Sequence, residues 1–405
     1  MDVPASRRCR SIAGALLAGF LAAIPIEAVS ITRGPYLGRP DDVSMAVVWL
    51  TDGVSPSAVE YSADDAAWTA VSDPTVSTRH VLRLSPLIPG ALYRYRVMLD
   101  GQPLSDTHAF RAPRDPADLT LHFGVIGDTD GVAVPAEIAA RLATVDIDLV
   151  LHTGDVVYPG GEESGYDAQF FQPMAPLIAS APVLPTLGNH DVLTDRGAPY
   201  LDAFILPAND ATGDSRFYAA RQGDALFVSV DVESSEFGAG SAQYQWLERT
   251  LRDSDALWKF VYLHEPPYSS AESNLAVRFI LTPLFESAGV DVVFSGHMHL
   301  YERTVAIRNF ATAGPGIVYV TEGGGGATFA AFVPQDFSAI VFARYGYLVV
   351  DIEGGNLMLT AHDLDGSVFD SLELHKTVPL VHRAIPERIG PPAKHPSAPD
   401  LPARP

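Results

Sequence analysis

The chain has 405 residues, of which 47% are hydrophobic and 19% charged, and its formal net charge is −22 at pH 7. This length is too great for one ordinary domain and suits two, and the composition is typical of soluble globular proteins. The acidic balance argues against a nucleic-acid groove, because such grooves need positive charge. It would also repel a phosphate-bearing substrate, so a site for one would need local positive charge from metal ions.

Residues 1–28 have the pattern of an export signal. Arginines at positions 7, 8 and 10 precede an apolar run over 12–26, and a small residue, Ala28, follows. The run is shorter than the roughly 20 residues that a membrane-spanning helix needs. We therefore expect an exported protein, periplasmic or extracellular, with an uncleaved membrane anchor as the alternative. Cys9, the only cysteine, precedes the apolar run, so the exported chain would have no disulfides.

Residues 29–114 show short strands with alternating hydrophobicity and almost no helical periodicity. Asp100-Gly101 is a hairpin turn signal, and the stretch 87–90 resembles the corner before a late strand of fibronectin type III sandwiches. We expect an all-β, fibronectin III-like sandwich that packs against the next domain, with a carbohydrate- or partner-binding module as the alternative. Its inward-facing residues are predicted to be Met45, Val47 and Trp49 on one strand and Tyr93, Tyr95 and Val97 on another.

From 117 to 376 strands alternate with helices, which predicts an α/β domain. Polar residues suited to metals or catalysis follow one predicted strand after another, and active sites of α/β sheets lie at the carboxyl ends of the strands. Burying such groups unpaired would be costly. The residues in question are Asp128, Asp155, Tyr158, Asn189, His190, Asp191, His264, His297 and His299.

The two last histidines give the strongest local signal. Residues two apart on extended chain point the same way, so both imidazoles can face one site. Imidazole is the commonest metal ligand among side chains. Together with the carboxylates at the other strand ends, they predict a metal site.

The order of these motifs, GD, GDxxY, GNHD, H and GHxHxYER, resembles that of the calcineurin-like metallophosphatases, and within them the purple acid phosphatase branch. That branch is marked by Tyr158 in the second motif, by the complete stretch from Gly296 to Arg303, and by the preceding β domain. The resemblance covers roughly residues 29–376. It implies a four-layer α/β sandwich in which two mixed β-sheets are flanked by helices.

The resemblance also implies a binuclear metal centre. Asp128, Asp155, Tyr158 and His299 would hold one ion, and Asp155, Asn189, His264 and His297 the other, with Asp155 bridging. The first set has three anionic ligands and suits Fe(III), whereas the second suits a divalent ion such as Zn, Mn or Fe(II). The implied activity is hydrolysis of phosphate monoesters by attack of a metal-bound hydroxide.

Several residues around the metals receive expected roles. Asn189 and His190 would contact the substrate, and Asp191 would orient His190. The family often has a further histidine after the equivalent of His264, but 269–274 contains none. Glu265 or Glu272 would then supply the proton to the leaving group.

For other positions near the motifs we expect a structural role. We expect His122 and His152 to be core histidines with satisfied hydrogen bonds, and Asp130 to support a metal ligand or merely form a turn. The glycines at 323–326 resemble the family's glycine-rich turn, which packs near the metals.

The alternatives are a phosphodiesterase or nucleotidase that uses the same site, and a non-catalytic metal or phosphate binder. The expected partner is a small phosphoester, with no nucleic-acid groove and no membrane span after removal of the export signal. Residues 377–405 are dense in proline, which predicts a disordered tail.

Overall fold

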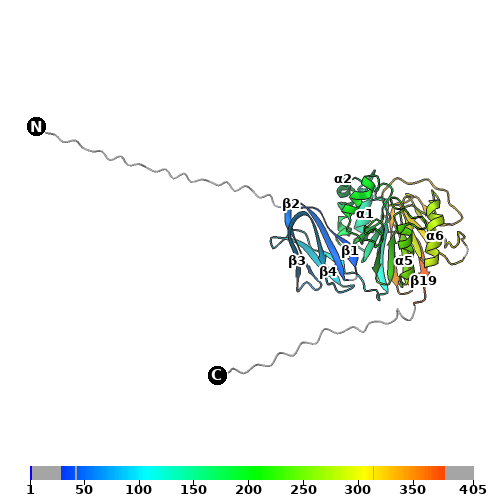
Figure 1. Ribbon diagram of the computed structural model, residues 1–405, viewed down its shortest axis with the longest axis horizontal. Helices are drawn as coiled ribbons and strands as arrows, with labels where there is room; N and C mark the ends of the chain where they lie inside the picture. The colour runs from blue at the N-terminus through cyan, green and yellow to red at the C-terminus, as the bar shows by residue number, and fades with distance from the viewer. Residues whose placement is uncertain (2–28, 42, 313, 379–405) are drawn as a thin grey trace, which may run out of the picture.

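The computed structural model describes residues 1, 29–41, 43–312 and 314–378, which form three hydrogen-bonded sheets (Figure 1). The predicted export signal and nearly all of the predicted proline-rich tail lie outside these residues. Among the described residues, no helix is long and apolar enough to cross a membrane.

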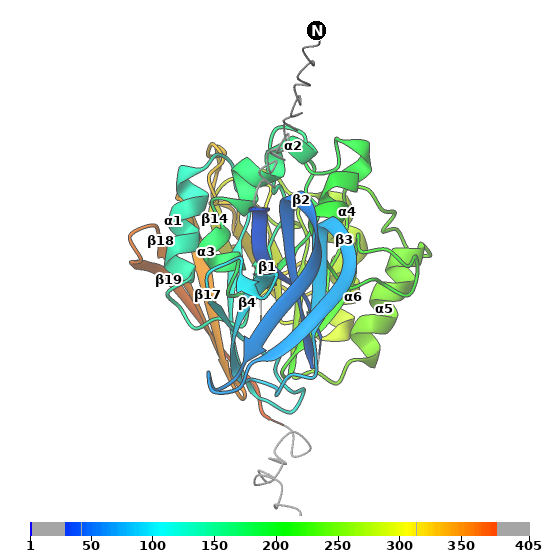
Figure 2. The same ribbon diagram turned by 90° about the vertical axis from the view of Figure 1, so that its left-hand side faces the viewer.

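The N-terminal domain is all-β, as predicted, and its long strand β2 pairs with three other strands (Figure 2). β2 pairs with β1 and β3 and, near its end, with β4; its register shifts between Leu50 and Ser55. The inward faces predicted from the sequence are buried and enclose this domain's own core. Asp100 and Gly101 both have positive φ, as the hairpin turn requires. The strands are β1 (Ile31–Asp41), β2 (Ser44–Ser62), β3 (Thr69–Leu84), β4 (Leu92–Leu99), β5 (Gln102–Pro103) and β6 (His108–Arg111).

The N-terminal domain packs against the next one, as expected. The Tyr36 hydroxyl donates a hydrogen bond to the carbonyl of Ala203 (2.7 Å), and the Tyr95 hydroxyl donates one to that of Ala179 (2.9 Å). Tyr36 and Val48 belong to the same buried cluster as the core of the following domain. The two domains therefore share a continuous hydrophobic core.

The second domain contains two mixed sheets, which confirms the predicted sheet type. The first catalytic sheet has the order β19-β18-β17-β7-β8-β9, with β7, β8 and β9 parallel. The second catalytic sheet has the order β10-β11-β12-β13-β15-β14-β16, with β11, β12, β13 and β15 parallel. Parallel neighbours bring the carboxyl ends of their strands to the same edge.

The strands of the first catalytic sheet are β7 (Thr120–Ile126), β8 (Leu149–His152), β9 (Val183–Pro185), β17 (Gly346–Glu353), β18 (Asn356–Asp363) and β19 (Val368–His375). Those of the second are β10 (Tyr218–Gln222), β11 (Ala225–Ser229), β12 (Trp258–Tyr262), β13 (Val292–Ser295), β14 (Tyr301–Thr304), β15 (Val318–Glu322) and β16 (Ser338–Phe342).

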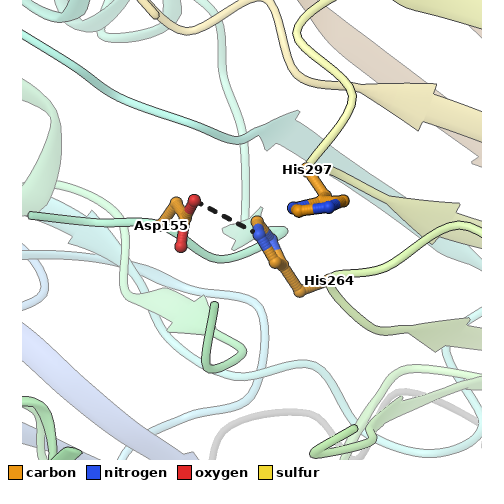
Figure 3. Close-up of side chains that lie close together, drawn as sticks. All are labelled: Asp155, His264 and His297. Atoms are coloured by element: carbon orange, nitrogen blue, oxygen red, sulfur yellow. Dashed lines mark ion pairs between the residues drawn. The ribbon is translucent and has the colours of Figure 1, made fainter. Parts of the chain in front are cut away.

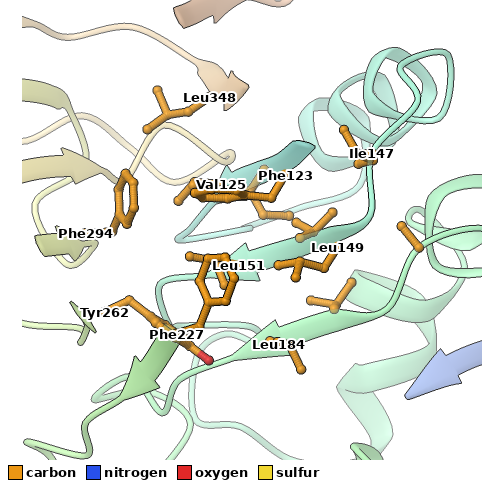
Figure 4. Close-up of a cluster of buried hydrophobic side chains, with 14 of the residues drawn as sticks. Phe123, Val125, Ile147, Leu149, Leu151, Leu184, Phe227, Tyr262, Phe294 and Leu348 are labelled. Atoms are coloured by element: carbon orange, nitrogen blue, oxygen red, sulfur yellow. The ribbon is translucent and has the colours of Figure 1, made fainter. Parts of the chain in front are cut away.

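The two catalytic sheets are joined by aromatic and aliphatic side chains (Figure 4). Phe123 of the first sheet makes edge-to-face contacts with Phe227, Phe260 and Phe294 of the second, with ring centroids 5.0–6.2 Å apart. Such contacts add to the free energy gained from burying apolar area. The interior between the sheets is therefore a packed hydrophobic core beneath the strand ends.

Helices cover the outer faces of the two sheets. Ile138 and Leu142 of α1 belong to the cluster of the first sheet, whereas Trp246 of α5 and Phe285 of α6 pack on the second. The helical segments are α1 (Ala133–Leu142), α2 (Glu163–Tyr166), η1 (Asp167–Phe171), α3 (Ala175–Ile178), η2 (Asp195–Gly197), α4 (Ala198–Ala203), α5 (Ala242–Asp253) and α6 (Leu275–Ala288).

Candidate metal centre

Two groups of possible metal ligands meet where the carboxyl ends of the two catalytic sheets face each other. In one, ligand atoms of Asp155, His264 and His297 all lie within 4.8 Å of one another; in the other, those of Asp128, Asp155 and His299 do. Asp155 belongs to both groups. The sequence-predicted bridging residue thus stands at the position where a bridge would be needed.

The backbone at these residues is unusual. Asp128 and Asp155 both have φ of 54°, and His297 has φ of 65°. Non-glycine residues rarely adopt this left-handed conformation, and it costs about 1–3 kcal/mol at each position. The chain therefore turns sharply after each of these strands, at or beside a candidate ligand.

The motif glycines are explained by close approach to these carboxylates. A Cβ on Gly188 would lie 2.2 Å from Asp155 Oδ1, and one on Gly296 would lie 2.4 Å from Asp128 Oδ2. No side chain fits at either position without moving a candidate ligand. Gly188 and Gly296 therefore allow the loops that carry Asn189 and His297 to approach Asp155 and Asp128 closely.

The first group gathers anionic oxygens around one point. The Tyr158 hydroxyl lies 3.1 Å from Asp155 Oδ2, 3.4 Å from Asp128 Oδ1 and 3.4 Å from His299 Nε2. Burial, followed by the charges of Asp128 and Asp155, raises the pKa of the Tyr158 phenol far above its usual range. A phenolate there would consequently require a highly charged cation beside it.

The second group places two imidazoles, those of His264 and His297, beside the same aspartate (Figure 3). Asn189 Oδ1 lies 3.0 Å from His264 Nε2 and 2.8 Å from His297 Nδ1, and His264 Nε2 is 3.3 Å from Asp155 Oδ2. Three different strand ends supply these side chains, and their nitrogen and oxygen atoms meet in a common space. Such a set suits a divalent transition metal.

Backbone carbonyls orient two of the imidazoles. His264 Nδ1 lies 2.8 Å from the carbonyl of Thr153, and His299 Nδ1 lies 2.7 Å from that of Thr328. If each Nδ1–H donates to its carbonyl, Nε2 of each ring is left as a lone-pair donor toward the carboxylates. This arrangement is typical of metal-binding histidines.

The charges of the site fit bound cations. Asp128 and Asp155 are 0% and 1% exposed, and among the described residues neither forms an ion pair with a lysine or arginine. Burial alone would raise the pKa of Asp155, but the adjacent His264 outweighs this and holds it below its usual range. Buried carboxylates that have imidazoles but no lysine or arginine beside them can be stabilised by metal coordination.

His190 lies beside these groups rather than inside either of them. Its ring stacks obliquely on Tyr158 with centroids 4.5 Å apart, and its Nε2 is 4.0 Å from Asp155 Oδ2. Its Nδ1 is paired with the carbonyl of Pro159. Nε2 is therefore the ring nitrogen that faces the candidate ligand Asp155.

Asp191 does not orient His190 directly, which corrects the expectation from the sequence. Its carboxylate accepts hydrogen bonds from the backbone N–H groups of Val156 (3.0 Å) and Gly188 (2.9 Å). Asp191 is fully buried, and burial together with the charge of Asp155 raises its pKa to about 7. Asp191 therefore fixes the two loops that carry Asp155 and Asn189.

Glu265 and Glu272, the expected proton donors, line one pocket together with His297 and Met298. Asn274 also lines it; its Nδ2 donates to Glu265, while its Oδ1 accepts the N–H of Val277 and so begins helix α6. This pocket adjoins the second ligand group through His297, and we call it the leaving-group pocket.

Glu233 was not predicted from the sequence. It follows β11 at the same edge of the second sheet, and its Oε1 is buried with no hydrogen-bond partner. Burial raises its pKa to about 8, with Glu265 and Asp155 adding to the shift and His264 opposing it. Glu233 lies outside the recognised motifs, so only the neighbourhood of β11 and β12 could have indicated it.

The remaining sequence expectations have mixed outcomes. His152 is a buried histidine whose Nε2 lies 2.9 Å from the Thr129 hydroxyl, as predicted. His122 is only half-buried and pairs with Asp351 at 2.7 Å; the expectation of a core position was wrong, because its side chain faces the outside of the sheet. The glycine-rich turn does pack near a candidate metal ligand, since a Cβ on Gly323 would lie 3.1 Å from Asp128 Oδ2. The Asp130 side chain has no such contact among the described hydrogen bonds, although its amide bonds to the Asp128 carbonyl.

Comparison with known proteins gives the class of this domain. Residues 104–301 match the family model described as calcineurin-like phosphoesterase. Residues 104–301 are therefore similar to calcineurin-like phosphoesterases, in agreement with the two mixed sheets and the Asp–His clusters at their edge.

Proteins with similar sequences include several acid phosphatases. The chain is 27% identical over 260 residues to purple acid phosphatase 22 of Arabidopsis thaliana, a match that covers 61% of this chain and 58% of that protein. It is 26% identical over 394 residues to acid phosphatase type 7 of Mus musculus, covering 83% and 88%. The structure of purple acid phosphatase PPD1 from yellow lupin (Lupinus luteus) shares the fold, with a TM-score of 0.73 at 22% identity over 84% of this chain and 74% of that one. The Arabidopsis and mouse relatives are both named as acid phosphatases.

Proposed function

We propose that the protein is an exported phosphatase that hydrolyses phosphate monoesters at a binuclear metal centre. The observation that carries the proposal is the double membership of Asp155, whose carboxylate lies within reach of both candidate ligand groups. A single bridging carboxylate between two ligand sets is suited to two neighbouring ions. The similarity to purple acid phosphatases supports the same conclusion.

The proposed first ion is Fe(III), held by Asp128, Asp155, Tyr158 and His299. The proposed second ion is Zn, Mn or Fe(II), held by Asp155, Asn189, His264 and His297. Two such ions, when bound, would neutralise the phosphoryl oxygens and lower the pKa of water at the site.

The chain's own residues would complete the reaction around them. His190 Nε2, which lies 4.0 Å from Asp155 Oδ2, would donate a hydrogen bond to the phosphoryl group. Glu265 or Glu272 in the leaving-group pocket would give the proton to the departing alkoxide. The buried Asp191 would keep the two ligand loops in register.

Export and the fibronectin III-like nature of the N-terminal domain belong to the same proposal. Export rests on the charge and hydropathy pattern of residues 1–28. The fibronectin III-like assignment rests on the all-β sheet and its aromatic core. Release of the processed chain from cells into the periplasm or medium would test export.

The alternative is a phosphodiesterase or nucleotidase that uses the same site. The decisive experiment compares purified protein on p-nitrophenyl phosphate and on bis(p-nitrophenyl) phosphate, with nucleoside monophosphates as a third class. We expect the monoester to have the larger kcat/KM. A larger value for the diester would replace the proposal by the alternative, and no hydrolysis of any ester after metal loading would favour a binding protein.

A further inference from the structure

Strand β14 (Tyr301–Thr304) begins two residues after the candidate ligand His299. Side chains on both faces of this strand form hydrogen bonds with neighbouring segments. On one face, the Tyr301 hydroxyl donates to Asp370 Oδ2 at 2.6 Å, and Arg303 donates to both oxygens of Asp370 at 2.6 and 2.9 Å. Asp370 belongs to β19 of the first catalytic sheet. This face therefore ties the two sheets together.

Glu302 points to the opposite face, because successive side chains of a strand alternate. It is 1% exposed. Its Oε2 accepts the Ser270 N–H, and its Oε1 accepts the hydroxyls of Ser270 and Ser338, each at 2.6 Å. Three donors thus converge on a side chain that, as a carboxylate, only accepts. Hydrogen bonds to a charged acceptor are among the stronger ones in proteins.

Ser270 opens the segment 270–274, which has no regular secondary structure before helix α6 begins. Glu272, Ser273 and Asn274 of this segment form one wall of the leaving-group pocket. The segment is also tied by the Val333 N–H, which donates to the Ser270 carbonyl at 3.1 Å. The buried Glu302, 32 residues further along the chain on strand β14, therefore holds the start of this segment through its hydrogen bonds to Ser270.

We propose that Glu302 is a positioning residue, which holds segment 270–274 so that the leaving-group pocket keeps the shape that selects among phosphoesters. The inference rests on the proposed function, because it assumes that the phosphoryl group binds at the metals. The remainder of the ester would then extend past His297 into the pocket. Glu302 touches neither ester nor metal, and acts through Ser270.

Glu302→Gln tests this role while keeping the side-chain size. The amide is uncharged and one of its ends is an NH₂ group, so the serine hydroxyls would have to rotate and accept from it, and the charge-assisted hydrogen bonds to Glu302 would be lost. The test uses two substrates: 1-naphthyl phosphate, whose leaving group fills a pocket, and fluorophosphate, whose leaving group is a single atom. We expect kcat/KM for the naphthyl ester to fall about tenfold, mainly through KM, because a hydrogen bond to a charged group is lost. The value for fluorophosphate should stay within about twofold.

Matched variants separate positioning from general destabilisation. Asp370→Asn weakens the opposite face of the same strand, so it should lower the thermal midpoint and leave the ratio of the two kcat/KM values unchanged. Ser270→Ala removes one donor to Glu302 and should shift the ratio in the same direction by a smaller factor. This variant carries the test if Glu302→Gln does not fold.

Equal losses on both substrates, or the same change of ratio in Asp370→Asn, would overturn the inference. Loss of metal from Glu302→Gln with an unchanged ratio would do so as well. If the wild-type protein hydrolyses neither substrate, the proposed function itself fails. Wild-type activity with an unchanged ratio in both Glu302→Gln and Ser270→Ala would refute only the role of Glu302.

Discussion

The two catalytic sheets contribute different chemistry to the same edge. The first sheet supplies the anionic and amide side chains, Asp128, Asp155, Tyr158 and Asn189, which follow β7, β8 and β9. The second supplies the imidazoles, His264, His297 and His299, which follow β12 and β13. Neither sheet holds a complete ligand group, since both groups combine residues from the two sheets.

This division suggests why the site lies at the junction of the sheets. Carboxylates crowded on one sheet repel one another, whereas imidazoles on the other can share cations with them. Bound metals would therefore link the two sheets at the top, as the phenylalanine contacts link them below. We expect metal binding and the packing of the sheets to be coupled, because a ligand that binds only the folded state stabilises it.

The largest effect should come from Asp155→Asn, which removes the one side chain common to both ligand groups. Both ions should be lost, and activity should fall by at least about a thousandfold, because metal ions supply several kcal/mol of transition-state stabilisation. Metal analysis and ester hydrolysis would be measured on the same sample. Asp370→Asn, a carboxylate change away from the metals, should keep both ions, and an active Asp155→Asn protein with two metals would refute the bridge.

The second-largest loss of activity is expected from changing the glutamates of the leaving-group pocket, which adjoins the second sheet. If Glu265 or Glu272 is the proton donor, its change to Gln should slow hydrolysis of an alkyl phosphate by about a hundredfold. An activated aryl phosphate, which scarcely needs protonation, should be affected far less. Each variant would be assayed on both esters. Equal losses on the two substrates, or none, would leave His190 as the donor.

Tyr158→Phe probes the anionic character of the first sheet. A phenolate bound to Fe(III) absorbs visible light, so the wild-type protein should be coloured and the variant colourless. The ion among Asn189, His264 and His297 should remain, and activity should fall by about tenfold, since one of several ligands is lost. Absorption spectra and iron content of both proteins would show whether Tyr158 binds the iron. A variant that keeps the band would remove Tyr158 from the ligand set.

The convergence of several predicted ligands could be anticipated from the sequence because their positions follow from local rules. A strand followed by glycine and a polar residue marks a sheet edge, and parallel strands bring such edges together, as the convergence of Asp128, Asp155 and His297 shows. The contacts of Asp191 and Glu302 could not be predicted in this way. Their partners, Val156 and Ser270, lie 35 and 32 residues away in loops that only the tertiary packing brings close.

The smallest effect should come from His122, on the exposed side of the first sheet. Its hydrogen bond with Asp351 raises the pKa of His122 above the ordinary value, although burial opposes the shift. A raised folded-state pKa means that the pair stabilises the protein below the unfolded pKa of about 6.5, and that this stability is lost as pH rises through the folded-state value. Nearby Asp148 adds to the shift, and Arg114 opposes it.

His122→Asn should accordingly lower the denaturation midpoint more at pH 5 than at pH 9. The difference should be small, because the pair is partly exposed to solvent. Denaturant titrations of the two proteins at both pH values would measure it, with Asp351→Asn as the partner control. A loss that is the same at both pH values would show that the ion pair contributes nothing.

The central claim is that two ions, shared by the two sheets, are required for ester hydrolysis. The most direct measurement is the metal content of the purified protein, taken together with hydrolysis of p-nitrophenyl phosphate before chelation, after chelation and after metal is restored. We predict two ions per chain, one of them iron, with activity and thermal midpoint both falling on chelation and recovering together. Full activity in metal-free protein, or activity that saturates with one ion per chain, would contradict it.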